Sequence, residues 1–505
     1  MKSYWEEDRK KYKKWESINN DIKTDICIIG GGLAGLSTAY YTGLRTDVIV
    51  LEKDRICNST SGKNTGKVTS QHGLFYDYLL NLQGEEYAKD YLNINENAIN
   101  EIERIINKEN IDCDFTKESS YVFTKQEKEI EKLKNENKVV NLLQTGISDY
   151  KENIELPITI KGAIEFKNQA QIHPIKYGYG LAKAIEKNGG KIFENTQVKN
   201  VRKEENRYII DVNDKKVIAN HVVIATRYPI ISFPGYYFLK MYQSTSYAMV
   251  FDCKEQLFKG MYISAEVPTI SFRVIKERNK ELLLVVGYDY KTGTAEAEDG
   301  YQNITNIVKN IYPNAECLYK WTAEDCISLD KIPYIGEYSN TMENLYIETG
   351  FNKWGITLSN VAGQIISDKI FNKENRFENI FKSTRLRPVK NKDELLNMVK
   401  EAGKSIILSK FKIPEEKLEK IKNDEGKIIN INDKKVGVYK DKEGKVYAVK
   451  PICTHLGCEL YFNNIEKIWE CPCHGSKFNY DGTSIEVPSN KDLCICQVKN
   501  GPFYN

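Results

Sequence analysis

Four cysteines and two histidines gather in two short boxes near the end of this 505-residue chain. The first box reads Cys453-x-His455-x-x-Cys458, and the second reads Cys471-x-Cys473-His474 followed by Gly-Ser. Thiolates and imidazoles at such spacing are typical metal ligands. The chain has 12 Cys and 5 His in all, so this concentration in one segment predicts a metal centre held by two loops.

The two boxes resemble the Rieske ferredoxin fold, in which two loops of a small β-sandwich hold a 2Fe-2S cluster. The resemblance implies that Cys453 and Cys471 hold one iron, and that His455 and His474 hold the other. It also implies a disulfide between Cys458 and Cys473, as in the Rieske proteins of respiratory cytochrome bc complexes. A tetrahedral zinc site is the alternative, but zinc boxes do not usually alternate Cys-x-His with Cys-x-x-His.

Two further positions bear on the potential of such a cluster. In high-potential Rieske proteins, a serine in the second box and a tyrosine two residues later donate hydroxyl hydrogen bonds to cluster sulfurs. This chain keeps the serine as Ser476 but has Phe478 at the second position. The resemblance therefore implies one lost donor and a potential between the extremes of the Rieske range.

A glycine-rich turn near the start of the chain indicates a second site. Gly30-x-Gly32-x-x-Gly35 follows an apolar strand pattern at residues 25–29 and opens an apolar helix, and Glu52 ends the next strand. The first glycine permits the tight turn, the second lets a pyrophosphate approach the helix N-terminus, and the third lets helix and strand pack closely. Glu52 can accept hydrogen bonds from a ribose. The pattern predicts a dinucleotide site.

Three later segments resemble the D-amino-acid-oxidase-like (DAO) family of FAD enzymes. They are a polar run at 58–69, the sequence Thr196-Gln197-Val198, and the glycine turn Gly350-Phe351-Asn352-Lys353-Trp354-Gly355. No second Gly-x-Gly-x-x-Gly follows a strand, so we expect no separate NAD(P)H site. The resemblance implies FAD contacts at Gly30, Gly32, Leu33, Ala34, Gly35, Glu52, Lys53, Gly62, Thr65, Gly66, Lys67, Val198, Gly350, Phe351, Trp354 and Gly355.

The substrate side departs from the family pattern. DAO-like enzymes that oxidise amino acids usually place an arginine shortly before an Asp-x-x-Pro-x-x-Gly run, and here the matching position is Asp325. An acid there would repel a carboxylate, which argues against amino-acid oxidation. Arg273 could supply a substitute cation, although a surface arginine is the commoner case. Candidate catalytic residues are Lys67, His72, Arg273 and Lys353.

The elements that must position these residues fall into three parts. Residues 1–388 are expected to combine an α/β, Rossmann-like FAD-binding domain (about 20–75, 165–235 and 325–388) with a β-rich, α+β substrate or cap domain (about 76–164 and 236–324). A polar linker is expected over 389–424, and an all-β Rieske domain over 425–505. Helical spacing predicts helices over about 84–108 and 126–143, alternation predicts an antiparallel sheet over 244–290, and the N-terminal arm is expected to be helical.

Composition excludes several classes of protein. Lys+Arg number 73 and Asp+Glu 70, a balance that does not favour nucleic-acid binding. No apolar run is long enough for a transmembrane segment, and no signal peptide is visible, so we expect a cytoplasmic protein. Outside the boxes only His72, His173 and His221 remain, widely spaced, which argues against a mononuclear iron oxygenase.

These features predict an oxidoreductase with FAD and a 2Fe-2S cluster. In the first hypothesis a small organic substrate, an amine or a related compound, reduces FAD, and the cluster removes the electrons singly for an acceptor protein or a quinone. A second hypothesis reverses the flow, from a donor protein to a substrate. A third is an electron-transfer or redox-sensing protein without turnover of its own.

Overall fold

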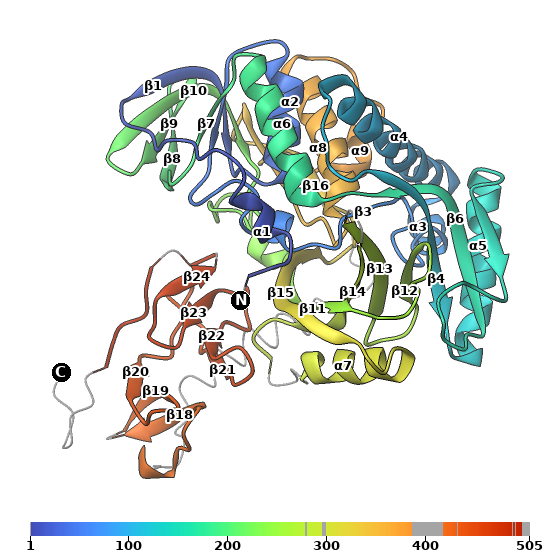
Figure 1. The fold of residues 1–505 in the computed structure, drawn as a ribbon. Helices are drawn as coiled ribbons and strands as arrows, with labels where there is room; N and C mark the ends of the chain where they lie inside the picture. The colour runs from blue at the N-terminus through green and yellow to red at the C-terminus, as the bar shows by residue number, and fades with distance from the viewer. Residues whose placement is uncertain are drawn as a thin grey trace.

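The computed structural model describes residues 2–277, 280–294, 299–385, 418–431, 433–486, 488–489 and 491–496. Two large sheets and a small C-terminal β module make up these residues (Figure 1). The mixed α/β architecture with a β-rich second domain and an all-β end agrees with the predicted fold class. Among the helices of the described ranges, none has the length and apolar character needed to cross a membrane.

The first sheet is built around five parallel strands, in the order β17 (Leu345–Thr349), β10 (Lys215–Ile224), β1 (Ile22–Ile29), β2 (Val48–Leu51) and β7 (Lys191–Phe193). Three antiparallel strands extend it: β16 (Tyr334–Glu337), β8 (Val198–Glu204) and β9 (Arg207–Val212). Helices α2 (Leu33–Gly43), α6 (Pro174–Lys187) and α8 (Gly355–Ile370) pack beside it (Figure 1). The β1–α2–β2 unit is the one predicted from the glycine turn.

The second sheet runs in the order β15 (Glu316–Ser328), β11 (Met241–Asp252), β14 (Lys280–Lys291), β13 (Ile270–Glu277), β12 (Met261–Ser264), β4 (Thr116–Thr124), β6 (Gly162–Gln171) and β3 (Lys67–Val68). Strand β5 (Ser148–Lys151) pairs with β6. Strands β11 to β14 confirm the antiparallel pattern predicted over 244–290. Helix α7 (Gly300–Ile311) packs on β14 and β11.

Three helices connect or cover these sheets: α3 (Tyr76–Gln83), α4 (Glu85–Glu109) and α5 (Ile130–Leu143). The last two confirm the predicted helices. The apolar face of α4 packs against α8 and α6, so this long helix joins the region between the sheets to the helices of the first sheet. Three single turns, η1 (Thr60–Gly62), η2 (Glu127–Glu129) and η3 (Tyr237–Leu239), and the short α9 (Glu378–Phe381) complete this region.

The N-terminal arm differs from the prediction. Only α1 (Glu6–Arg9) is helical, and the residues after Tyr12 run without helix to β1. Trp5 explains why the arm is nevertheless fixed: its ring is fully buried, and its indole N–H donates to the carbonyl oxygen of Asn64 at 2.8 Å. Tertiary contacts to the loop before β3 therefore hold the arm in place of helical hydrogen bonds.

The C-terminal module contains two small antiparallel sheets. One holds β18 (Glu425–Ile431), β19 (Lys434–Lys440) and β20 (Val446–Val449), and the other holds β21 (Tyr461–Asn463), β22 (Ile468–Glu470), β23 (Lys477–Asn479) and β24 (Ser484–Glu486). Residues 389–417 of the expected linker lie outside the described residues. The rest of that stretch includes η4 (Leu418–Lys420) and Ile421, which is buried against Ile429, Val436 and Val438 of the module.

Candidate redox sites

Two loops of the C-terminal module bring the predicted metal ligands together. Cys453 and Cys471 are both almost fully buried, and both belong to one cluster of buried side chains in the module. The rings of His455 and His474 lie with their centroids 5.1 Å apart, and the Nδ1 atom of each is buried without a hydrogen-bond partner in the described residues. Two thiols and two unpaired imidazole nitrogens form the donor set that a Rieske cluster requires.

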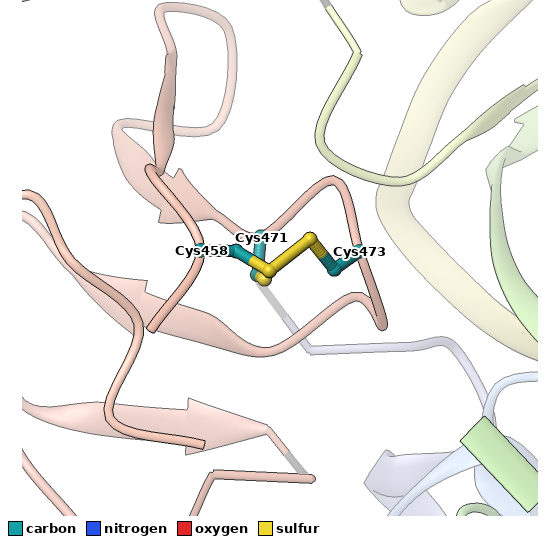
Figure 2. A group of neighbouring side chains, drawn as sticks. All are labelled: Cys458, Cys471 and Cys473. Carbon is teal, nitrogen blue, oxygen red and sulfur yellow. A yellow bond between two sulfur atoms is a disulfide. The ribbon is translucent and has the colours of Figure 1, made fainter. Parts of the chain in front are cut away.

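The other two cysteines of the boxes are joined in a disulfide, Cys458–Cys473 (Figure 2). Their sulfurs and that of Cys471 lie within 4.8 Å of one another. Because two of these three sulfurs are bonded together, only Cys471 can act as a thiolate ligand. The backbone N–H of Cys453 also donates to the carbonyl oxygen of Cys458 at 2.8 Å, so the disulfide and this hydrogen bond stabilise the ligand loops.

The glycine turn after β1 has the close approaches expected of a dinucleotide site. Gly30 has a φ of +116°, and a Cβ atom there would lie 2.7 Å from the carbonyl oxygen of Ala225. A Cβ atom on Gly35 would lie 2.0 Å from the carbonyl oxygen of Gly30, so only glycine lets α2 begin this close to β1. The Glu52 carboxylate accepts the N–H of Gly31 at 2.8 Å, while its burial raises the pKa of that carboxyl.

A long cavity begins at this turn, at the carboxyl ends of β1, β2 and β10. Its walls include most of the residues expected to contact FAD: Gly30, Gly32, Leu33, Ala34, Glu52, Lys53, Thr65, Lys67, Val198, Gly350, Phe351, Trp354 and Gly355. The cavity runs from the N-terminus of α2 past Trp354, and these residues fit an extended dinucleotide. Gly35, Gly62 and Gly66 lie outside the lining, where added Cβ atoms would meet backbone oxygens of Gly30, Cys57 and Ile172.

Arg273 corrects one prediction. Its side chain is buried, and its Nη1 donates to the carbonyl oxygens of Thr65 at 2.6 Å and Ile172 at 3.3 Å. It therefore lies neither on the surface nor among the residues that line the two described cavities. Its contacts fix the loop around Thr65 and correct the expectation of a surface arginine, while a role of Arg273 in substrate binding stays a prediction.

Lys67, the first residue of β3, also lines the FAD cavity. Its Nζ donates to the carbonyl oxygen of Tyr262 at 2.8 Å and to the Oγ of Ser271 at 2.6 Å. Burial lowers the pKa of this lysine to about 7, with a further contribution from the charge of Arg273. An amine with this pKa can hold or release a proton near neutral pH.

A second cavity adjoins the first and shares Lys353 and Trp354 with it. His72 stacks on Trp354 with ring centroids 4.9 Å apart, its Nε2 contacts the carbonyl oxygen of Thr69, and its Nδ1 contacts the hydroxyl of Tyr91. Burial lowers the pKa of His72 to about 3, so the ring is neutral near pH 7. Both of its nitrogens have hydrogen-bond partners. The other lining residues are Phe75, Tyr91, Tyr242, Ser244, Asp289, Ile327, Lys331, Asn352, Lys353 and Trp354.

Two acids lie near Lys353. Its Nζ is 2.8 Å from an oxygen of Asp289. Burial would raise the pKa of Asp289, but the charge and hydrogen bond of Lys353 outweigh it and hold that pKa below its usual range. Asp325, in the wall of the FAD cavity, has a pKa raised to about 6 by burial. Asp325, the acid at the position where amino-acid oxidases of the family have an arginine, therefore borders the FAD cavity.

The C-terminal module contacts residues 2–385, here called the flavin part, directly beside both sites. Gln243 Nε2 donates to the carbonyl oxygen of His474, and the N–H of Gly293 donates to Glu470 at 3.0 Å. Tyr228 lies against both histidine rings, with centroid distances of 6.3 Å to His455 and 6.3 Å to His474. Nothing in the sequence boxes indicates these contacts, because each joins residues that are far apart along the chain.

Pro488 of the module lines the FAD cavity, and residues 225–227, which precede Tyr228, line it as well. The FAD cavity and the histidine side of the cluster site are therefore separated by one short segment of chain. The segment is Ala225 to Tyr228, directly after β10. Apolar spacing in β10 predicts the strand, but only the folded chain reveals that its last residues lead into the boundary between the two sites.

Comparison with known proteins agrees with this geometry. Residues 25–369 match the family model DAO, FAD dependent oxidoreductase, and residues 412–499 match the Rieske [2Fe-2S] domain. A Rieske 2Fe-2S iron-sulfur protein of Bacillus subtilis, YhfW, is 32% identical over 94% of this chain and 94% of its own length. Gamma-glutamylputrescine oxidoreductase of Escherichia coli is 23% identical over 74% of this chain and 90% of that protein.

Among solved structures, glycine oxidase from Geobacillus kaustophilus superposes with a TM-score of 0.59 at 18% identity. The match covers 73% of this chain and 100% of that chain. At this identity the likeness bears on the fold alone.

Proposed function

Because this chain belongs to the DAO family of FAD-dependent oxidoreductases and carries a C-terminal Rieske [2Fe-2S] domain, we propose that it oxidises a small amine or a related substrate. In this proposal the two electrons taken from the substrate leave one at a time through the cluster, to an acceptor protein or a quinone. FAD supplies two-electron chemistry at carbon, and the cluster supplies one-electron transfer.

The contact between the two sites is the observation that supports this proposal most. Residues 225–227 border the FAD cavity, and the next residue, Tyr228, lies against the rings of His455 and His474. A chain that bound the two groups for unrelated purposes would have no need to bring them so close. The short segment supports an exchange of electrons within one molecule.

The second cavity is the proposed substrate site, because it opens on Trp354 and Lys353 of the family's flavin turn. Its described lining contains one carboxylate, Asp289, and two lysines, Lys331 and Lys353, but no arginine. The bidentate arginine clamp for a substrate carboxylate is therefore missing from it, which supports an amine over an amino acid as the substrate class. The neutral, doubly hydrogen-bonded His72 holds Trp354 as a fixed wall. The related Escherichia coli protein is named as an oxidoreductase of gamma-glutamylputrescine, a compound with an amino group, which supports the same class.

An anaerobic titration tests the proposal. Holoprotein is mixed with amines, amino acids and 2-hydroxy acids, while flavin absorbance and the electron paramagnetic resonance (EPR) signal of the cluster are recorded. An amine is expected to bleach the flavin and then to produce the signal of the reduced cluster. A Cys453→Ser variant that lacks the cluster should still bleach but give no signal.

The opposite pattern would support the reverse direction of flow. If no organic substrate bleaches the flavin, while a reduced donor protein reduces the cluster first and the flavin after it, the chain is a reductase. If no substrate reduces either the flavin or the cluster, the result supports the third hypothesis, a protein that transfers or senses electrons without turnover of its own.

A further inference from the structure

Tyr228 comes from the flavin part of the chain but lies at the cluster site. Its side chain is 2% exposed, and its ring contacts both predicted histidine ligands at equal centroid distances of 6.3 Å. Its backbone is fixed, since its carbonyl oxygen accepts the hydroxyl of Thr226 at 2.8 Å. The position of this phenol therefore depends on the flavin part and not on the two ligand loops.

The hydroxyl of Tyr228 is buried without a hydrogen-bond partner among the described residues. Buried hydroxyls in native proteins almost always have a partner, so an unpaired one beside a ligand site points to an acceptor on the ligand. Burial raises the pKa of the phenol far above its usual value, and the nearby thiol groups of Cys326 and of the predicted ligand Cys471 act in the same direction. The group is a neutral donor, next to the site that sulfur atoms would fill.

In the second box and β23, residues 471–479, the one side chain with a hydroxyl is Ser476. Ser476 is fully buried at the end of the second box, and Phe478 follows it on β23. Phe478 is fully buried within the apolar cluster that contains Cys453 and Cys471, and it has no hydroxyl to donate. Position 478, where high-potential Rieske proteins have a tyrosine, therefore supplies no hydroxyl to the cluster in this chain.

We propose that Tyr228 donates a hydrogen bond to a sulfur of the cluster across the interface between the two parts of the chain. A hydrogen bond to sulfur stabilises the more negative, reduced cluster, so the contact raises the midpoint potential. The potential is then a property of the docked chain and not of the Rieske module alone. This inference needs a bound cluster, but it holds for either direction of electron flow and for any substrate.

The direct test is Tyr228→Phe in the full-length protein loaded with FAD and cluster. We expect its equilibrium constant for reduction to fall about tenfold, which is about 59 mV for a one-electron couple. The midpoint is measured by redox titration followed by EPR. The matched control is Tyr237→Phe, which removes another buried hydroxyl of the same region, one that donates to the carbonyl oxygen of Tyr338 at 2.9 Å. The control should leave the midpoint unchanged.

A second measurement detects the proton of the proposed hydrogen bond directly. Electron–nuclear double resonance on the reduced wild-type cluster, in normal and in deuterated water, is expected to show a strongly coupled exchangeable proton. Tyr228→Phe should lose this proton, and Tyr237→Phe should keep it. An unchanged midpoint in Tyr228→Phe with full cluster content, or the same proton couplings in both variants, would overturn the proposal.

Discussion

The Nζ of Lys477 lies 2.8 Å from the Oε1 of Glu324, and both side chains are 3% exposed at the boundary between the Rieske module and the flavin part. Lys63 and Arg227 reach the other carboxylate oxygen, at 3.9 and 3.5 Å. Burial alone would raise the pKa of Glu324, but these three cations outweigh it and hold the pKa well below its usual range. Lys477 begins β23, directly after Ser476 of the ligand loop, so this ion pair fixes one cluster loop to β15 of the second sheet.

Lys477→Met is expected to destabilise the docked chain. Removing one partner of a buried ion pair costs about 3–5 kcal/mol, because the other charge stays buried. Urea unfolding followed by cluster absorbance measures the loss. A Lys477→Met/Glu324→Gln double variant should recover part of it, and Lys435→Met, which breaks the Lys435–Glu459 pair within the module, serves as a control. A loss no larger than that of the control would contradict the role given to Lys477.

Truncation before the module, near Asn391, is expected to leave a folded yellow protein, because both large sheets are complete within residues 2–385. The fragment lacks Pro488 from the wall of the FAD cavity, so FAD should dissociate from it faster than from the full chain. Flavin fluorescence after dilution reports the release. A colourless or insoluble fragment would count against an independent flavin part.

The disulfide Cys458–Cys473 is expected to persist in freshly isolated, cluster-loaded protein, where mass spectrometry after alkylation should find no free thiol at either position. The two cysteines are 15 residues apart, and closing a loop of this length stabilises a chain by about 3 kcal/mol. Cys458→Ala/Cys473→Ala should therefore lower the stability of the module and speed cluster loss. Two alkylated thiols in loaded wild-type protein would refute the bridge.

Phe478→Tyr is expected to raise the midpoint of the cluster, because the new hydroxyl would start from a fully buried ring among the cluster cysteines. Protein-film voltammetry measures the change. Phe462→Tyr, on a ring that packs on Trp469 and Tyr439, is a matched control and should have no effect. A lower or unchanged midpoint in Phe478→Tyr would mean that position 478 does not face the cluster sulfurs.

His72 predicts a dependence of stability on pH. Burial lowers its pKa from 6.5 to about 3, so between these values the unfolded chain binds a proton that the folded chain does not. The free energy of unfolding must therefore fall as the pH falls from about 6.5 toward 3, by up to about 1.4 kcal/mol per pH unit from this group. His72→Gln is expected to be less stable than wild type at pH 7, with a gap that narrows at pH 5. Urea unfolding at both values checks this, and a constant gap would contradict it.

Local sequence patterns predict the elements that would hold the cofactors. Tertiary contacts explain where the structure differs from the sequence-based predictions. Gly30, Gly32 and Glu52 belong to one strand–turn–helix–strand unit, whose spacing alone reveals its geometry. The expectation that Arg273 lies on the surface is wrong, because its acceptors, Thr65 and Ile172, meet it only in the folded chain. The interface has no sequence signal for a related reason: Glu324 is one charge within a long strand, and its partners on three other segments have no spacing in the sequence that connects them.

The place of Pro488 in the FAD cavity bears on how the chain is made. The ribosome releases the strands and the glycine turn of the flavin part well before it adds Pro488, and N-terminal domains usually fold first. Until the C-terminal end emerges, the cavity lacks Pro488 from its lining. Its closure then comes after translation of the last segment, so the arrival of the iron–sulfur module completes the pocket of a cofactor that belongs to the other end of the chain.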